Sequence, residues 1–214
     1  NPLFLSPTSF VIEDQKGELL SASIAKDGQW RFPVNNDVPE KFVRCIIAFE
    51  DNRFYYHPGF DPFAFARAIR QNLTQNRIVS GGSTLTMQVI RLSRKKPRTF
   101  WQKLLEIILA TRLELSYSKK EILALYASNA PFGTNVVGLD AAAWRYYGRG
   151  PQQLSWGEIA TLAVLPNAPS LVHPGRNKEK LVKNKKVRNI KRKSRKKDDK
   201  NEIDVDNASK EEEK

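Results

Sequence analysis

With 214 residues, 40% of them hydrophobic and 10% aromatic, the chain can bury a core, which excludes disorder throughout. The formal net charge of +13 predicts an anionic partner such as phosphate, nucleic acid or a lipid surface. Cys45 is the only cysteine, so an intrachain disulfide is excluded. No apolar run is long enough to span a bilayer, and because the chain starts at Asn1 without a signal peptide, we expect a fragment of a longer protein.

Positive charge is concentrated near the C-terminus. Residues 1–175 contain 20 basic and 14 acidic side chains, whereas residues 176–214 contain 16 and 9. The run Lys178–Lys200 has almost no apolar side chains, so it cannot bury enough surface to offset the entropy lost on ordering. We therefore predict a disordered basic tail over residues 178–214, with polyanion binding as a less favoured role.

The first residues, 1–37, predict a small β-rich lead. Two segments, Phe10–Asp14 and Glu18–Ile24, favour a hairpin with Gly17 in its turn. From Pro39 onward the apolar residues recur at helical spacing. The predicted fold class is therefore mainly α, with a main domain over residues 38–177.

Helices are predicted from their caps and apolar faces. The first runs from Pro39 to Glu50. Asp61 is an N-cap followed by a helix-starting proline. From that second helix we expect three apolar side chains to point inward: Phe65, Ile69 and Leu73.

Further helix starts follow along the chain. Thr99 caps a helix whose predicted buried side carries Trp101, Leu104, Leu105 and Ile108. Ser118 and Ser155 each begin a capping box, which predicts two more helices. Another helix is predicted over about 137–147, ending at Gly148.

Three polar residues, Glu50, Asp51 and His57, gather after the first helix. The helix-end charge and nearby aromatic rings would raise the pKa of Glu50, as a general base requires. A solvated helix-end carboxylate is an equally good interpretation. Asp51 suits a loop hydrogen-bond acceptor, and His57 beside Pro58-Gly59 is more often a structural turn histidine than a catalytic group.

A second polar segment, Gly81-Gly82-Ser83-Thr84, leads into a predicted helix N-terminus, where backbone N–H groups favour anions. The simpler interpretation is a capped helix after a flexible loop, and the missing Walker lysine excludes a nucleotide P-loop. Lys103 and Glu106 share a helix face, which is typical of a surface ion pair and also suits a charged groove. Arg91 adds charge suited to phosphate, or to a solvated surface.

Five ordered motifs resemble the peptidoglycan glycosyltransferase domain of class A penicillin-binding proteins, glycosyltransferase family 51. The similarity covers about Val38 to Pro174. The motifs are Glu50-Asp51-x-x-Phe54-x-x-His57-x-Gly59-x-Asp61, Gly81-Gly82-Ser83-Thr84-x-Thr86-x-Gln88, Lys103-x-x-Glu106, Lys119-x-x-Ile122-Leu123-x-x-Tyr126 and Glu158 through Pro169. Met87 and the segment Asp27–Pro33 are most similar to the 1C branch of these proteins.

The resemblance implies a lysozyme-like α fold with a jaw region against the membrane, and polymerisation of lipid II with inversion at the MurNAc anomeric carbon. It implies two catalytic residues, Glu50 as the base for the acceptor 4-hydroxyl and Glu106, which would orient Lys103 or hold a divalent ion. Residues implied to bind the substrate and its pyrophosphate are Lys103, Arg91, Ser83, Thr84, Gln88, His57 and Gln102. Those implied to be structural are Asp51, Phe54, Gly59, Asp61, Gly81, Gly82 and Tyr126.

The resemblance implies no required cofactor, although it is compatible with Mg²⁺ or Mn²⁺ near Glu106. The partners that it implies are lipid II, the nascent glycan strand, the membrane surface and a partner transpeptidase, with no nucleic acid. The sequence itself contains no segment that resembles a transpeptidase domain. The expected location is the periplasmic, extracytoplasmic face of the inner cell membrane, with the anchor helix outside this sequence.

Three positions depart from the family pattern. Gln102 stands where many relatives have arginine, Arg91 where many have lysine, and Ser128 where asparagine is expected. Gln102 and Ser128 keep a second hypothesis open, a catalytically idle module that binds lipid II or glycan. A third is nucleic-acid binding through Lys178–Lys200, and lysozyme-like hydrolysis is less favoured because it needs no cations for a pyrophosphate.

Overall fold

The computed structural model describes residues 3–74, 82–97 and 99–167, and most of these residues are helical. The helices are α1 (Glu40–Glu50), α2 (Pro62–Thr74), α3 (Leu85–Arg94), α4 (Phe100–Ser116), α5 (Lys119–Asn129), α6 (Leu139–Tyr147) and α7 (Trp156–Val164). The short 3₁₀ helices are η1 (Phe54–Tyr56), η2 (Pro151–Gln153) and η3 (Leu165–Asn167). The mainly α fold class is confirmed, and the arrangement is consistent with a lysozyme-like fold. The predicted disordered tail lies outside the described residues.

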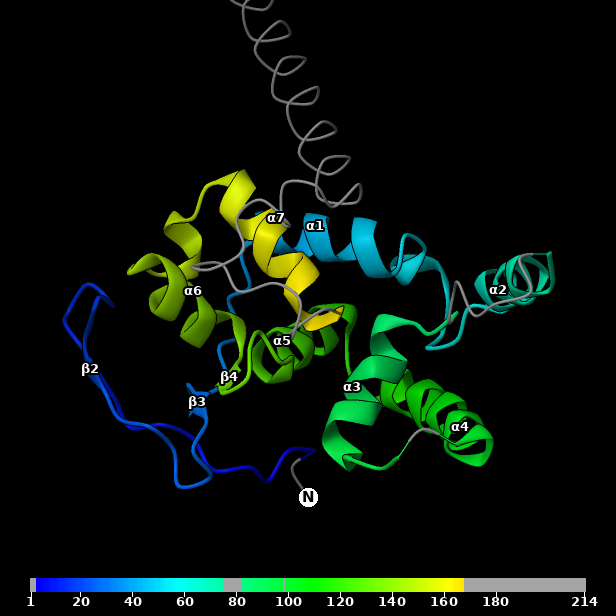
Figure 1. Ribbon diagram of the computed structural model, residues 1–214, viewed down its shortest axis with the longest axis horizontal. Coiled ribbons are helices and arrows are strands. Elements are labelled where there is room, and N and C mark those ends of the chain that lie inside the picture. Colours follow the sequence, from blue (N-terminus) through cyan, green and yellow to red (C-terminus); the bar gives the residue numbers. More distant parts are fainter. Residues whose placement is uncertain (1–2, 75–81, 98, 168–214) are drawn as a thin grey trace, which may run out of the picture.

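The core is built around α5, which lies between the other helices in Figure 1. Helix α1 packs on α7, and α3 packs on both α4 and α5. The capping boxes predicted at Ser118 and Ser155 are both present at the starts of α5 and α7. Large side chains from several of these elements are fully buried together, among them Tyr126, Phe42, Phe54, Phe132, Ile46 and Leu162.

The lead contains the predicted hairpin, in which β1 (Val11–Glu13) pairs antiparallel with β2 (Leu19–Ala22). A second pairing joins β3 (Trp30–Arg31) in parallel to β4 (Val136–Val137), between α5 and α6. Side chains of the lead, including Phe4, pack against the same hydrophobic core as the helices. The domain boundary at residue 37 stays a prediction.

The predicted buried side of α4 is wrong. Trp101 is 77% exposed and Ile108 is 61% exposed, and Leu104 is also exposed. The face of α4 that is buried instead carries Glu106, Ala110 and Leu113. That face packs on α3, where Arg91 and Thr86 donate hydrogen bonds to carboxylates of α4, so the apolar side of α4 turns outward.

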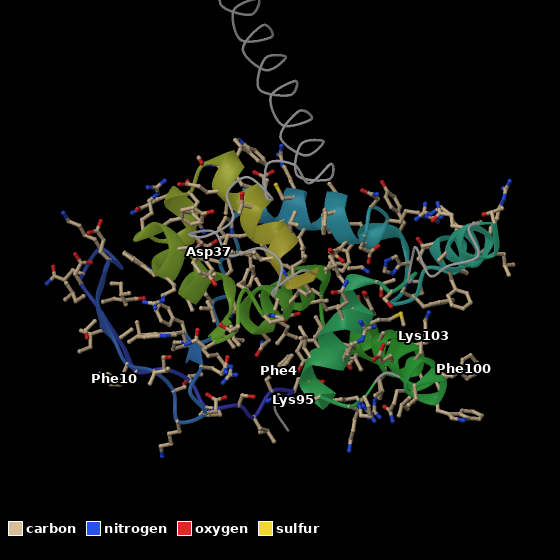
Figure 2. The ribbon with its side chains drawn as sticks, in the orientation of Figure 1. Phe4, Phe10, Asp37, Lys95, Phe100 and Lys103 are labelled. Carbon is tan, nitrogen blue, oxygen red and sulfur yellow. The ribbon has the colours of Figure 1, made fainter. Side chains whose placement is uncertain are left out.

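Helix α2 also exposes apolar side chains. Leu73, which was predicted to point inward, is 77% exposed, and Phe63 is 68% exposed. Helices α2 and α4 lie together at one end of the molecule, opposite the β1–β2 hairpin (Figure 1). Figure 2 shows Phe100 of α4 and Phe10 of the lead at these opposite ends. The exposed apolar side chains of these two helices, hereafter called the α2–α4 face, are Phe63, Leu73, Phe100, Trp101, Leu104, Ile108 and Leu115.

Candidate active site

Glu50 is the last residue of α1 and lies near α3 and α5. The Gln88 side chain on α3 donates a hydrogen bond of 3.1 Å from Nε2 to Oε2 of Glu50. On α5, burial raises the pKa of Tyr126 well above its usual range, and the negative charge of Glu50 adds to that rise. The hydroxyl of Tyr126 has no hydrogen-bond partner among the described residues. Glu50 thus combines a half-buried position with a fixed amide donor.

The loop that follows Glu50 is fastened by Asp51 and His57. Asp51 is buried, and its Oδ2 accepts a 3.0 Å hydrogen bond from the backbone N–H of Leu85 at the start of α3. Both carboxylate oxygens of Asp51 lie 3.0 Å from Nε2 of the buried His57. The sequence prediction that Asp51 is a loop hydrogen-bond acceptor is therefore confirmed, and His57 is its side-chain partner.

Gly59 brings the same loop against α4. Its φ of +90° is in the left-handed region, and a Cβ there would lie 2.6 Å from the carbonyl carbon of Ala110. Thr84 donates a 2.6 Å hydrogen bond to the Gly59 carbonyl and accepts one from the N–H of Met87. Thr84 is therefore the N-cap of α3, as the simpler sequence interpretation predicts.

Two more motif residues shape the start of α2. Asp61 is 1% exposed and accepts hydrogen bonds of 3.0 Å from the N–H groups of Phe63 and Ala64, which confirms it as the predicted cap. Gly82 has a φ of +53°, and a Cβ there would lie 3.0 Å from the Cα of Phe65. Gly81 lies outside the described residues. Gly82 therefore packs closely against α2.

The second carboxylate, Glu106, is 8% exposed on the inner face of α4. Arg91 of α3 donates to both of its oxygens, with Nε 3.0 Å from Oε1 and Nη2 2.9 Å from Oε2. The same Nη2 lies 3.2 Å from the Ser83 hydroxyl oxygen. Such a two-point guanidinium–carboxylate pair is among the stronger interactions that side chains make.

Both oxygens of Glu106, the residue near which a divalent ion is compatible with the family, are hydrogen-bonded to Arg91. Within residues 3–74, 82–97 and 99–167, no group of three His, Cys, Asp or Glu side chains could hold a metal ion.

One face of α3 holds both carboxylates. Gln88, which bonds Glu50, and Arg91, which bonds Glu106, are three residues apart and therefore neighbours on the helix surface. Residues at this spacing have Cβ atoms about 5–6 Å apart. The arrangement presents a carboxylate suited to take a proton beside a carboxylate–guanidinium pair.

The predicted cationic residues lie on the same helices. Lys103 is one turn before Glu106 on α4, and its Nζ lies 4.8 Å from the centre of the Phe65 ring of α2. Gln102 accepts a hydrogen bond of 3.3 Å from Nη2 of Arg94. A guanidinium is therefore present at the Gln102 side chain although residue 102 is not an arginine.

Comparison with known proteins identifies the family. Residues 16–193 match the family model described as Transglycosylase. The chain belongs to this family. It is 47% identical over 167 residues to penicillin-binding protein 1C of Escherichia coli (strain K12), covering 78% of this chain and 22% of that protein.

Two further relatives agree. Penicillin-binding protein 1A of Aquifex aeolicus (strain VF5) is 36% identical over 184 residues, 85% of this chain and 25% of that protein. Penicillin-binding protein 1F of Bacillus subtilis (strain 168) is 35% identical over 184 residues, 83% and 25%. The chain thus spans about a quarter of the length of these relatives. The family recognised from the motifs is confirmed.

The structure of this Transglycosylase domain brings four more polar residues into the framework of the site: Arg94, Thr86, Glu114 and Lys119. Sequence reasoning missed Arg94 and Glu114, and it included Thr86 and Lys119 in the motifs without assigning them a role. Glu114 follows Glu106 by eight residues, which places both on one side of α4. The signal in the sequence was the spacing of Glu106, Ala110 and Glu114, which are four residues apart and share one side of a largely apolar helix. The apolar residues of α4 were instead predicted to form its buried side.

Proposed function

We propose that this chain polymerises lipid II into glycan strands, with release of undecaprenyl pyrophosphate. Glu50 is the base in this proposal. The observation that carries it is the placement of Glu50 and the Arg91–Glu106 pair along one face of α3, in a chain of the Transglycosylase family.

The reaction needs one proton transfer and one displacement. The acceptor 4-hydroxyl gives its proton to Glu50 as its oxygen attacks C1 of the growing strand, and the bond from C1 to the pyrophosphate breaks. Attack from the face opposite the leaving group inverts the anomeric carbon. The departing pyrophosphate needs positive charge rather than an acid proton, and Lys103 and Arg94 are the cations that we assign to it.

Two departures from the family pattern carry less weight against activity than the sequence alone indicates. Gln102 accepts a hydrogen bond from Arg94, which supports a guanidinium role for Arg94 at that position. Ser128 is 5% exposed within α5. A buried serine there is better explained by helix packing than by contact with substrate.

The α2–α4 face supports a membrane surface as a partner. Exposed apolar side chains of this extent on a monomer mark interaction sites. The exposed Arg67 and Arg70 on α2 add charge that suits anionic lipid headgroups. No helix in the described part of the chain is long and apolar enough to cross a membrane.

The remaining assignments are also proposals. We place the domain at the extracytoplasmic face of the cell membrane, where its lipid substrate would reach the α2–α4 face. A partner transpeptidase would cross-link the product. We propose that no divalent ion is needed, because Arg91 already neutralises Glu106.

Polymerisation of fluorescent lipid II, followed by gel separation of the strands, tests the activity. Glu50→Gln should lower the rate by at least about 1000-fold, because the amide cannot accept the proton. Glu40→Gln is the matched control on the same helix, since Glu40 pairs with Arg44 on an exposed surface. Equal rates for Glu50→Gln and the control would refute Glu50 as the base.

The idle-module hypothesis makes a different prediction. A wild-type chain that binds lipid II and releases no undecaprenyl pyrophosphate would favour binding without catalysis. Release of undecaprenyl pyrophosphate together with strands of inverted anomeric configuration, measured by NMR coupling constants, would exclude it.

A further inference from the structure

A partly buried ion pair contacts the loop that follows Glu50. Glu114 of α4, with its side chain 8% exposed, is 2.8 Å from Nζ of Lys119, the first residue of α5. The same Glu114 oxygen accepts a 2.6 Å hydrogen bond from the hydroxyl of Thr86 on α3. One carboxylate thus joins three helices at one point.

Lys119 extends this junction to the loop. Its Nζ donates a 2.8 Å hydrogen bond to the backbone carbonyl of His57 and lies 4.4 Å from the centre of the Phe54 ring. A lysine ammonium has three N–H donors, and Glu114, the His57 carbonyl and the Phe54 ring account for three directions of contact. Lys119 therefore contacts the loop at two residues of the first motif.

The loop is also fastened from its other side. Asp51 holds His57 by its ring and binds the N-terminus of α3, while Thr84 holds the Gly59 carbonyl. Lys119 engages the backbone of His57 rather than its ring, so it restrains a part of the loop that Asp51 does not reach. Glu50 immediately precedes this loop, so its carboxylate direction depends on where the loop lies.

The Glu114 side chain is 8% exposed and that of Lys119 is 23% exposed, so the carboxylate loses most of its hydration and the ammonium part of it, which lowers the net gain in stability from the pair. A well-packed apolar pair would stabilise α4 and α5 comparably. The charged pair also orients the Lys119 side chain. Glu114 holds the Lys119 ammonium where it can donate a hydrogen bond to the His57 carbonyl, which an apolar side chain could not do.

We propose that Glu114 and Lys119 are positioning residues that hold the segment from Asp51 to Gly59 so that Glu50 stays aligned for proton transfer. This inference rests on the proposed function of Glu50. In it neither Glu114 nor Lys119 contacts the substrate, and Thr86 supports the pair by bonding Glu114.

The first test compares Lys119→Met with Lys120→Met, its exposed neighbour on the same helix turn. Small misplacement of a catalytic group costs up to about 100-fold in rate. We expect Lys119→Met to lower kcat for lipid II polymerisation at least about 10-fold, with KM within about 2-fold. Lys120→Met should leave both constants unchanged.

Amide hydrogen exchange gives a readout that does not depend on activity. In Lys119→Met the amides of residues 51–59 should exchange faster, whereas those of α7 should keep their wild-type rates. Faster exchange everywhere would mean a general loss of stability and would overturn the positioning role. Wild-type kcat and wild-type exchange in Lys119→Met would overturn it as well.

Two milder variants guard against a misfolded Lys119→Met chain. Lys119→Arg keeps the charge and the donors, so it should restore kcat to within about 3-fold of wild type. Thr86→Val removes the hydroxyl bond to Glu114 without leaving a buried charge unpaired, and it should lower kcat by a few fold. Wild-type kcat in Thr86→Val combined with full loss in Lys119→Arg would contradict the proposal.

The two hypotheses fail separately. If the wild-type chain makes no glycan, the proposed function fails, and the exchange of residues 51–59 still measures whether Lys119 holds the loop. If the wild-type chain is active and Glu50→Gln is inactive while Lys119→Met matches Lys120→Met, the positioning inference alone is wrong.

Discussion

Helices α7 and α4 both contain many apolar residues, yet α7 buries its large apolar side chains whereas α4 buries a carboxylate and exposes most of its large apolar side chains. Helix α7 packs on α1 with Ile159 and Leu162 fully buried. Helix α4 packs on α3 with Glu106 buried and Trp101 exposed. The partner decides the difference, because α3 presents Arg91 and Thr86 to α4, whereas α1 presents Phe42 and Ile46 to the core.

Truncation of one apolar residue on each helix tests this difference in burial most directly. Leu162→Ala on α7 should lower the free energy of unfolding by about 2–5 kcal/mol, since it leaves a cavity in a packed core. Ile108→Ala on α4, where the side chain is exposed, should change it by less than about 0.5 kcal/mol. Urea unfolding without lipid measures both, and similar losses would mean that the α4 face is covered.

Thiol labelling tests the same difference between buried and exposed side chains. Burial raises the pKa of the Cys45 thiol on α1 to about 11, compared with an ordinary 9.0. At pH 8 its thiolate fraction is therefore about 100-fold lower, and iodoacetamide should label it at least that much more slowly than the urea-unfolded chain. In a Cys45→Ala background, Ile108→Cys should react at the rate of a free thiol.

The same pKa shift sets a pH dependence. Because the thiol ionises at a higher pH in the folded state than in the unfolded state, the unfolded state loses its proton first. Stability should be unaffected below pH 9.0 and should decline between pH 9.0 and about 11, and Cys45→Ala should reduce this decline. Urea unfolding across this pH range measures it, and an unchanged slope in the variant would contradict it.

Lipid binding tests whether the α2–α4 face contacts a membrane surface. Trp101→Ser should weaken cosedimentation with anionic phospholipid vesicles by about 10-fold, because a large side chain no longer enters the lipid. Phe10→Ser removes an equally exposed aromatic ring at the opposite end of the molecule, so it should leave binding unchanged. An equal loss in both variants would show that the attraction is not specific to this face.

A further prediction concerns Arg94, which we assign to the pyrophosphate. Arg94→Gln removes the guanidinium beside Gln102, and we expect the rate of lipid II polymerisation to fall about 10-fold. The double variant Arg94→Gln/Gln102→Arg should regain part of the loss, because it returns a guanidinium to the same pair of side chains. Wild-type rates in the single variant would remove Arg94 from the pyrophosphate site.

Local chemistry made much of the fold predictable. The capping boxes at Ser118 and Ser155 and the cap at Asp61 need only neighbouring residues, and each is present. The hairpin around Gly17 is local in the same sense. The family was recognisable because its motifs have fixed order and spacing.

What the sequence could not supply was the identity of distant partners. Nothing near Glu106 indicates that its partner would be Arg91 of α3 rather than Lys103, its neighbour on α4. Likewise, the outward turn of Trp101 follows from the polar face of α3 and not from the pattern within α4. The raised pKa expected for Glu50 and the roles assigned to the site residues stay predictions.

The parallel pairing of β3 with β4 carries a consequence for synthesis on the ribosome. Trp30 and Arg31 find their strand partners only at Val136 and Val137. Everything between them must leave the exit tunnel before the two strands can pair, so β3 stays without its partner while α1 to α5 are translated. Nascent chains stalled before Val136 should therefore be cut by protease within the lead, and chains stalled well beyond it should resist.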